Sequence, residues 1–133
     1  MAPILVGWVS ATLAFLALDA LWLSQMVPRL YQPLLGEIMR PQLNIAAAAA
    51  FYAIYTFGIA YLAVLPALEK DSLTRALLYG AALGLVAYAT YNLTNLATLR
   101  AWDIRLTLAD MTWGVGATAI AACVGYAAAS RIG

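Results

Sequence analysis

Four long apolar stretches dominate this sequence and confine the chain to a membrane. They run from about Ile4 to Met26, Leu43 to Leu65, Leu77 to Leu99 and Leu106 to Ala129. A helix needs about 20 predominantly apolar residues to cross hydrocarbon about 30 Å thick, and each stretch has that length. Because the connections are short, consecutive helices must be antiparallel neighbours. We therefore predict an all-α membrane protein in which residues 1–133 form a single four-transmembrane-helix domain, an up-down-up-down bundle.

The composition excludes the main alternatives to a membrane protein. Hydrophobic residues make up 65% of the chain and charged residues 10%, against roughly 25% charged residues in ordinary soluble proteins. This excludes a monomeric soluble globule, a disordered chain, a coiled coil and a disulfide scaffold. A net charge of +1 argues against nucleic-acid binding. The absence of histidine excludes bis-His haem, His-ligated metals and His-based catalysis, and we expect no cofactor.

Prolines mark the ends of the first two stretches. Pro28, Pro33 and Pro41 are expected to break the chain after the first span, and Pro66 to close the second. The first stretch is predicted to be a true span, because its amino end has no Lys or Arg and its apolar run exceeds a signal-peptide core. The connection at 27–43 has two interpretations. It is either a short amphipathic segment in the headgroup zone, anchored by Tyr31, or an irregular loop.

Basic residues give little indication of membrane orientation. Side A denotes the face with both chain ends and the second loop, and side B the face with the first and third loops. Side A carries Lys70, Arg75 and Arg131, and side B carries Arg29, Arg40, Arg100 and Arg105. The small excess favours side B as cytoplasmic under the positive-inside rule, and insertion in both orientations stays open.

Polar residues within the spans are the informative ones for function. Asp19 and Asp110 would each cost about 2.5–3.5 kcal/mol at the bilayer midplane on insertion scales. At 1.5 Å per residue, both aspartates and the three asparagines Asn44, Asn92 and Asn95 fall in the side-B half of the bilayer. Buried carboxyl groups in membranes usually face the bundle interior or a wet cavity. We therefore expect one polar pocket that opens toward side B.

Helical periodicity supports this convergence. Polar and aromatic residues at helical spacing form a stripe on each span, and on the second span the stripe is Tyr52, Tyr55 and Thr56. The candidate ligand-binding residues are Asp19, Trp22, Tyr88, Tyr91, Asn92, Asn95, Thr107, Asp110 and Trp113. Asn amides, Tyr and Thr hydroxyls and Trp indoles can all donate hydrogen bonds to a carboxylate. The alternative is that these groups only hold helices together, which is the favoured interpretation for Asn44 and Thr56. Similarly, Gly80 and Gly84 fit either packing within the bundle or a dimer contact.

Three segments resemble a known family. They are Leu18-Asp19-Ala20-Leu21-Trp22-Leu23, Tyr88-Ala89-Thr90-Tyr91-Asn92-Leu93-Thr94-Asn95-Leu96-Ala97-Thr98-Leu99 and Asp110-Met111-Thr112-Trp113-Gly114. They resemble the bacterial predicted membrane proteins of the domain-of-unknown-function 2177 family, over essentially the whole chain. The resemblance implies a four-span layout in the bacterial inner (cytoplasmic) membrane and no defined activity. It also implies that related chains often carry Asp where Asn92 stands here, so that this chain would lack one carboxylate.

Three functions are compatible with these features. The first is binding or transport of a small ligand, cation or proton at the Asp/Asn site, where transport would need at least a homodimer. The second is an intramembrane enzyme that acts on lipid or isoprenoid, with two carboxyls as acid and base, although no nucleophile–base pair or phosphate cradle is visible. The third is a structural or accessory membrane subunit. Membrane lipids and a possible homo-oligomer are the expected partners.

Overall fold

The computed structural model describes residues 2–132 of the chain, and most of these residues are helical, with no strand among them. The helices are α1 (Ala2–Met26), the π-helical segment η1 (Val27–Tyr31), α2 (Gln32–Leu35), α3 (Ile45–Ile59), the π-helical segment η2 (Ala60–Val64), α4 (Leu65–Glu69), α5 (Leu73–Thr98) and α6 (Ile104–Ser130). Joined end to end, they make four helices that are long and apolar enough to cross a membrane: Ala2–Leu35, Ile45–Glu69, α5 and α6. The predicted all-α membrane fold is confirmed.

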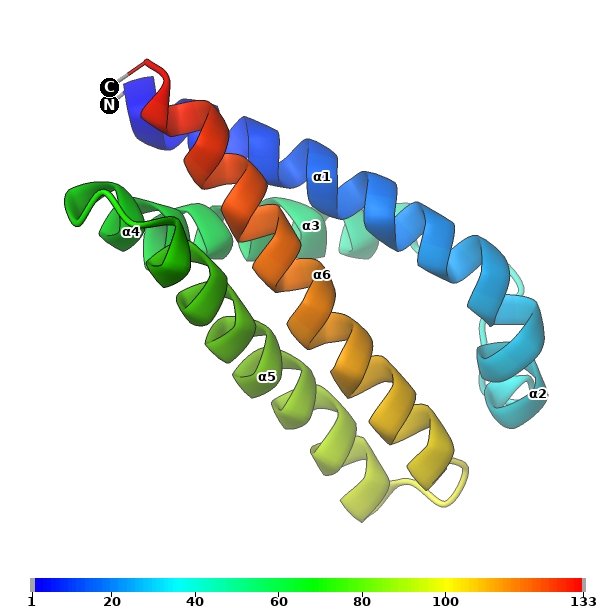
Figure 1. Cartoon of the computed structure of the whole chain (residues 1–133). Coiled ribbons are helices and arrows are strands. Elements are labelled where there is room, and N and C mark those ends of the chain that lie inside the picture. The colour runs from blue at the N-terminus through cyan, green and yellow to red at the C-terminus, as the bar shows by residue number, and fades with distance from the viewer. Residues whose placement is uncertain (1, 133) are drawn as a thin grey trace.

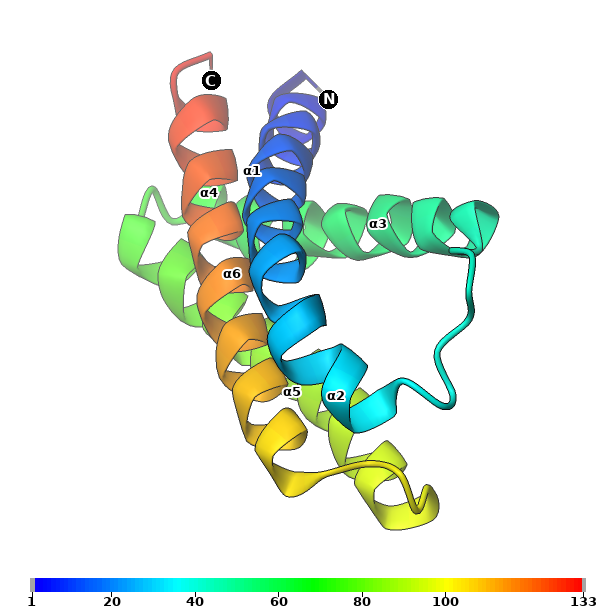
Figure 2. The ribbon, with the colours of Figure 1, turned by 90° about the vertical axis from the view of Figure 1, so that its right-hand side faces the viewer.

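The last helix, α6, forms the centre of the structure. It packs along α5 on one side and along α1 on another, and the start of α1 lies beside the end of α6 in both views (Figures 1 and 2). Small residues on α6 make this possible, since Ala117, Ala121, Ala122 and Ala129 are essentially fully buried. Short side chains let neighbouring backbones approach closely, which favours van der Waals packing between helices in lipid.

Glycines set the closest contact between α5 and α6. A Cβ built on Gly84 of α5 would collide with the backbone carbonyl of Gly114 on α6, and a Cβ on Gly80 would lie 2.8 Å from the Ala122 Cβ. Both glycines of the Gly80/Gly84 pair therefore face α6 of the same chain. Packing within the bundle accounts for them, and no dimer contact is needed to explain their position.

The third helix leaves the bundle at its amino end. Figure 2 shows α3 running steeply across the direction of α1 and α6 rather than along it. Its first residues have few neighbours, so Ile45 is 73% exposed and Ile54 is 72% exposed. Only the later part of this span, in η2 and α4, packs against both α5 and α6. The early part of α3 is therefore a separate wall that stands away from α5.

Three prolines that were expected to break or close spans lie inside continuous helices, which corrects the sequence analysis. The first helix runs past Pro28 and Pro33 to Leu35, and the second runs past Pro66 to Glu69. In each case a π-helical stretch ends two residues before a proline, at Tyr31 and at Val64. Proline has no N–H and its ring clashes with the carbonyl four residues earlier. A wider turn relieves that clash, so the helix continues. The connection at 27–43 is thus helical through Leu35 and irregular only after it.

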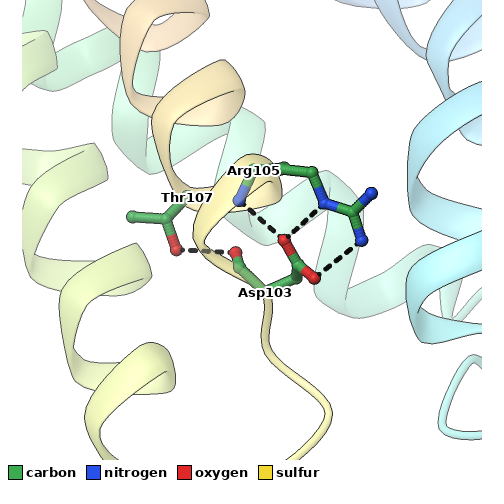
Figure 3. Close-up of polar contacts among 3 residues, drawn as sticks. All are labelled: Asp103, Arg105 and Thr107. Atoms are coloured by element: carbon green, nitrogen blue, oxygen red, sulfur yellow. Dashed lines mark hydrogen bonds and ion pairs between the residues drawn. The ribbon is translucent and has the colours of Figure 1, made fainter.

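Side-chain caps begin three of the helices. Asn44 accepts a hydrogen bond from the Ala47 backbone N–H at 3.1 Å, and Ser72 accepts one from Arg75 at 3.2 Å. Asp103 caps α6 by accepting from the Arg105 backbone N–H at 2.7 Å, and its carboxylate also pairs with the Arg105 side chain (Figure 3). Such caps satisfy backbone donors that the first turn leaves free. Asn44 is therefore a helix cap, and not the interhelical link that the sequence suggested.

Candidate functional site

The carboxylate of Asp110 lies on the inner face of α6 and is 7% exposed. It accepts a hydrogen bond from the Tyr31 hydroxyl of η1 and another from the Asn92 amide of α5, the latter at 2.7 Å. The same amide also donates to the Tyr88 carbonyl at 2.9 Å. Two acceptors therefore hold the Asn92 amide nitrogen, which leaves its oxygen as a buried acceptor with no partner among residues 2–132.

The second carboxylate, Asp19 of α1, is 8% exposed. It accepts hydrogen bonds from the Tyr52 hydroxyl of α3 and from the Trp113 indole of α6, the latter at 3.3 Å. Helix α3 has few other contacts in this half of the molecule, so the Tyr52–Asp19 bond is one of the links that hold it against α1.

A pair of tryptophans joins the two carboxylate groups into one network. Trp22 and Trp113 stack with ring centroids 4.7 Å apart and an interplanar angle of 9°. The Trp113 indole donates to Asp19, whereas the Trp22 indole donates to the Tyr31 hydroxyl at 2.9 Å, and that hydroxyl in turn donates to Asp110. Residues from α1, η1, α3, α5 and α6 thus meet in one chain of contacts.

Both carboxylates line a single cavity of about 400 Å³. Its other lining residues are Leu23, Tyr31, Phe51, Tyr55, Ala87, Tyr88 and Tyr91. Five of these seven side chains are aromatic, and none is basic. Cavities of roughly 300–1,000 Å³ with mostly apolar walls and a few polar groups are typical small-molecule sites.

No basic side chain neutralises the two carboxylates. Among residues 2–132 the ion pair found is Arg105–Asp103, which lies at the exposed start of α6. A carboxylate has about four lone-pair positions, and Asp19 and Asp110 each accept two hydrogen bonds. Each therefore retains acceptor capacity toward a further group. No cluster of three or more His, Cys, Asp or Glu side chains suited to a metal ion is present in the described part of the chain.

The sequence comparisons agree with this membrane architecture. The family model described as "Predicted membrane protein (DUF2177)" matches residues 4–127, which is nearly the whole chain. The chain belongs to the DUF2177 family. No curated protein and no solved structure matches it. The resemblance seen in the sequence is confirmed, and the family description adds membrane location and no activity.

Most of the predicted site residues of this DUF2177 protein lie together. Asp19, Trp22, Tyr88, Tyr91, Asn92, Asp110 and Trp113 all line the cavity or bond directly to groups that line it. Two predicted residues do not. Asn95 is partly buried, lies outside the cavity lining and makes no side-chain hydrogen bond within residues 2–132. The Thr107 hydroxyl donates to the carbonyl of Asp103, the N-cap of its own helix, at 3.1 Å.

The Asn92 side chain is a direct partner of the Asp110 carboxylate. Its amide donates to Asp110 at 2.7 Å. A carboxyl group in its place could make that bond only when protonated, since an ionised carboxylate has no donor. Asn92 therefore supplies a permanent donor to Asp110 and keeps one negative charge out of the cavity wall.

Two tyrosines that bond the carboxylates were missing from the predicted site. Tyr31 was interpreted as an interfacial anchor, and its helical position inside the site depends on the π-helical turn of η1. Tyr52 belonged to the expected stripe on the second span but was not selected, because a tyrosine on a helix face is compatible with packing alone. Phe51 and Tyr55 also line the cavity, and Tyr55 bonds Thr118 at 2.8 Å.

Proposed function

We propose that the protein binds a small organic cation in this cavity, with Asp19 and Asp110 as the counter-charges. The observation that carries the proposal is the pair of buried carboxylates, without a basic partner among residues 2–132, on a cavity wall that is otherwise mostly aromatic. An uncompensated carboxylate is costly in an apolar environment. A bound cation removes that cost by pairing with the carboxylates.

The aromatic wall favours an organic cation over a metal ion. Aromatic faces attract cations through the ring quadrupole, with energies from about 0.5 kcal/mol at exposed sites to about 2 kcal/mol where the pair is desolvated. The lining offers five rings for this purpose. Hard metal ions, by contrast, require six or more oxygen ligands, and two carboxylates with scattered tyrosine hydroxyls supply few of them.

A structural role is the second candidate, and the hydrogen bonds themselves favour it. Tyr52 to Asp19, Tyr31 to Asp110 and Asn92 to Asp110 connect separate helices. Interhelical hydrogen bonds in membranes contribute about 0.6 kcal/mol on average. In this alternative the cavity is left over from steep packing of α3, and the protein is an accessory subunit.

Choline and its uncharged isostere 3,3-dimethyl-1-butanol separate the two candidates, with the protein reconstituted in lipid nanodiscs. Choline should bind and the alcohol should not, as measured by calorimetry. Asp19→Asn and Asp110→Asn should each weaken choline binding at least about tenfold, since a charge contact of a few kcal/mol is lost. The thermal stability of these variants should stay unchanged or rise, because an amide costs less to bury than a carboxylate.

Asp103→Asn is the matched control, because it removes a carboxylate outside the cavity and should leave choline binding unchanged. The proposal is refuted if choline and the alcohol bind equally. It is also refuted if the two cavity variants lose stability and still bind choline normally, a result that the structural role predicts.

Two finer features belong to the same proposal. Transport of the bound cation would require a second copy of the chain, because four helices of this length enclose little space beyond the cavity of about 400 Å³ that both carboxylates line. The bacterial cytoplasmic membrane is the proposed location. The sequence resembles a family of bacterial proteins, and α-helical spans are the form that such membranes contain, whereas outer membranes hold β-barrels.

A further inference from the structure

The mouth of the cavity is apolar and its floor is acidic. Three of the lining residues are exposed at the surface: Leu23 by 36%, Phe51 by 44% and Tyr91 by 56%. They come from α1, α3 and α5, and all three lie inside helices that are long and apolar enough to cross a membrane. The carboxylates of Asp19 and Asp110 are more than nine-tenths buried. A group that enters therefore passes aliphatic and aromatic side chains before it reaches the charges.

The steep course of α3 explains why the mouth lies on the side of the bundle. The main contacts of α5 are with α6, η2 and α4, and the early part of α3 barely touches it. Figure 2 shows the amino end of α3 directed away from the other long helices. One contact between α3 and α5 is the edge-on pair of Tyr55 and Tyr88, whose ring centroids are 6.1 Å apart and which both line the cavity. The sequence predicts an opening toward side B, whereas an opening between α3 and α5, inside helices long and apolar enough to span a membrane, would face the hydrocarbon region of the bilayer.

The charges of the cavity limit which headgroup can enter. Its lining contains two carboxylates and no Lys or Arg. A phosphate group would be repelled by the carboxylates and would find no cation to bind, which disfavours ordinary phospholipids. A head with positive charge and no anionic group fits both the carboxylates and the aromatic faces.

We infer that the ligand is a single-chain amphiphile with an amine or ammonium head, which enters from the bilayer between α3 and α5. The head binds at Asp19 and Asp110, and the alkyl chain passes out between Phe51 and Tyr91 and stays in lipid. This inference rests on the proposed function, because it names the chemical class of the cation and its route. The cavity volume of about 400 Å³ accommodates the head and the first carbons of a chain, and the open side accommodates the remainder.

A series of alkyltrimethylammonium ions tests the route, from tetramethylammonium through hexyl and octyl to dodecyl. Each compound is titrated below its micelle concentration into nanodiscs with the wild-type protein. Specific binding is the difference from the double variant Asp19→Asn/Asp110→Asn in the same nanodiscs. If the chain remains in lipid, the apparent aqueous Kd should fall about fourfold for each added methylene, without a plateau up to dodecyl. Dodecyl sulfate, with the opposite charge, should show no specific binding.

Substitution at the mouth gives an independent measurement. Ala87 lines the cavity, whereas its neighbour Val86 is 64% exposed and does not line it. Ala87→Trp should reduce specific binding of the dodecyl compound at least about tenfold. Val86→Trp, the matched control, should leave it unchanged. Both variants place a tryptophan on the same turn of α5, so an effect of the indole on helix formation or on partitioning into lipid would affect the two variants alike.

The outcomes distinguish the route from the proposed function. An optimum at a short chain, or equal affinity for all members of the series, would show a cavity closed to the bilayer and would overturn this inference while the cation site stands. Absence of specific binding for every member, tetramethylammonium included, would overturn both. Equal binding by Ala87→Trp and wild type would also refute entry through this mouth.

Discussion

A single methyl group at Gly114 provides the sharpest test of how the central helices pack. A Cβ at this position would lie well inside 3.0 Å from three carbons of the Tyr88 ring, a separation that real Cβ atoms essentially never show. Tyr88 lies on α5 and lines the cavity. Its ring cannot simply swing away, because the nearest atom is Cγ, which stays close to the α5 backbone in every rotamer.

The expected cost of Gly114→Ala comes from this geometry. Ordinary carbon contacts lie at about 3.5–4.0 Å, so the ring or the helix must move by more than about 1 Å. Separation of α5 and α6 would relieve the clash, but it would also open the close contact between Gly84 and the Gly114 carbonyl. Overpacking costs about 1–3 kcal/mol, and an off-rotamer tyrosine adds about 0.5–1.5 kcal/mol. Together these give a penalty of about 1.5–4.5 kcal/mol.

Gly116→Ala supplies the reference for this measurement. Gly116 lies on the same helix, and a Cβ there meets nothing within 4 Å. Both substitutions gain the same helix propensity, up to about 1 kcal/mol, so the difference between the two variants isolates the clash. Reversible unfolding in mixed micelles on titration with sodium dodecyl sulfate should show Gly114→Ala less stable than Gly116→Ala by about 1.5–4.5 kcal/mol.

Removal of the ring should reverse the effect. In the double variant Gly114→Ala/Tyr88→Ala, the methyl group has space, so its cost relative to Tyr88→Ala alone should disappear. A strong coupling in this double-mutant cycle is expected of residues in direct contact. Equal stability of Gly114→Ala and Gly116→Ala would refute the packing of Tyr88 against α6, and with it the position of one cavity wall.

Two further predictions concern residues at helix ends. The Arg105 side chain, followed by the Arg105 backbone N–H, holds the pKa of Asp103 below its usual range. A carboxyl group of this kind stabilises the folded state above its unfolded pKa and loses that effect as the pH falls through the folded pKa. Thermal melts should therefore show Asp103→Asn, which keeps the cap, to be less stable than wild type at neutral pH and equally stable in strong acid. The same difference in melting temperature at every pH would contradict this. Asp71 has a φ of 48° and accepts a hydrogen bond from the Tyr126 hydroxyl at 2.9 Å. Asp71→Ala should therefore lower the free energy of unfolding by about 1–3 kcal/mol. Asp71→Asn should lower it little, because asparagine tolerates that backbone conformation and keeps an acceptor. Equal unfolding free energies for these two variants would refute the role assigned to Asp71.

The sequence alone predicts that Asp19 and Asp110 lie at one level of the bundle. Span length and a rise of 1.5 Å per residue fix the level of Asp19 and Asp110 whatever the helices pack against. Because a carboxylate is disfavoured against lipid, its inward orientation can also be predicted. The prediction that the two aspartates share a cavity therefore depended only on the lengths of the spans and on the charge of the side chains.

For some polar residues in the spans, the sequence could not show whether the side chain belongs to the site. Asn95 lies three positions after Asn92, which turns its side chain about 60° away on a helix with 3.6 residues per turn. Because of that angle, Asn92 reaches Asp110 and donates a hydrogen bond to it, whereas Asn95 lies outside the cavity lining. Thr107 satisfies its hydroxyl on its own backbone, an option that threonine always has in a helix.

The π-helical turns account for the remaining difference between the predicted site and the observed one. They explain why Tyr31 was not predicted to belong to the site. A periodic interpretation of the first span assumes 3.6 residues per turn throughout, whereas η1 inserts one extra residue into the turn at Val27–Tyr31. One extra residue rotates the next part of the helix by about 100°. Pro33 makes the wide turn favourable, because a regular turn would set its ring against the Arg29 carbonyl. The proline thus brings the Tyr31 hydroxyl to Asp110. Wide turns of this kind cost stability and are frequent at functional sites, which supports a binding role for the carboxylate that Tyr31 contacts.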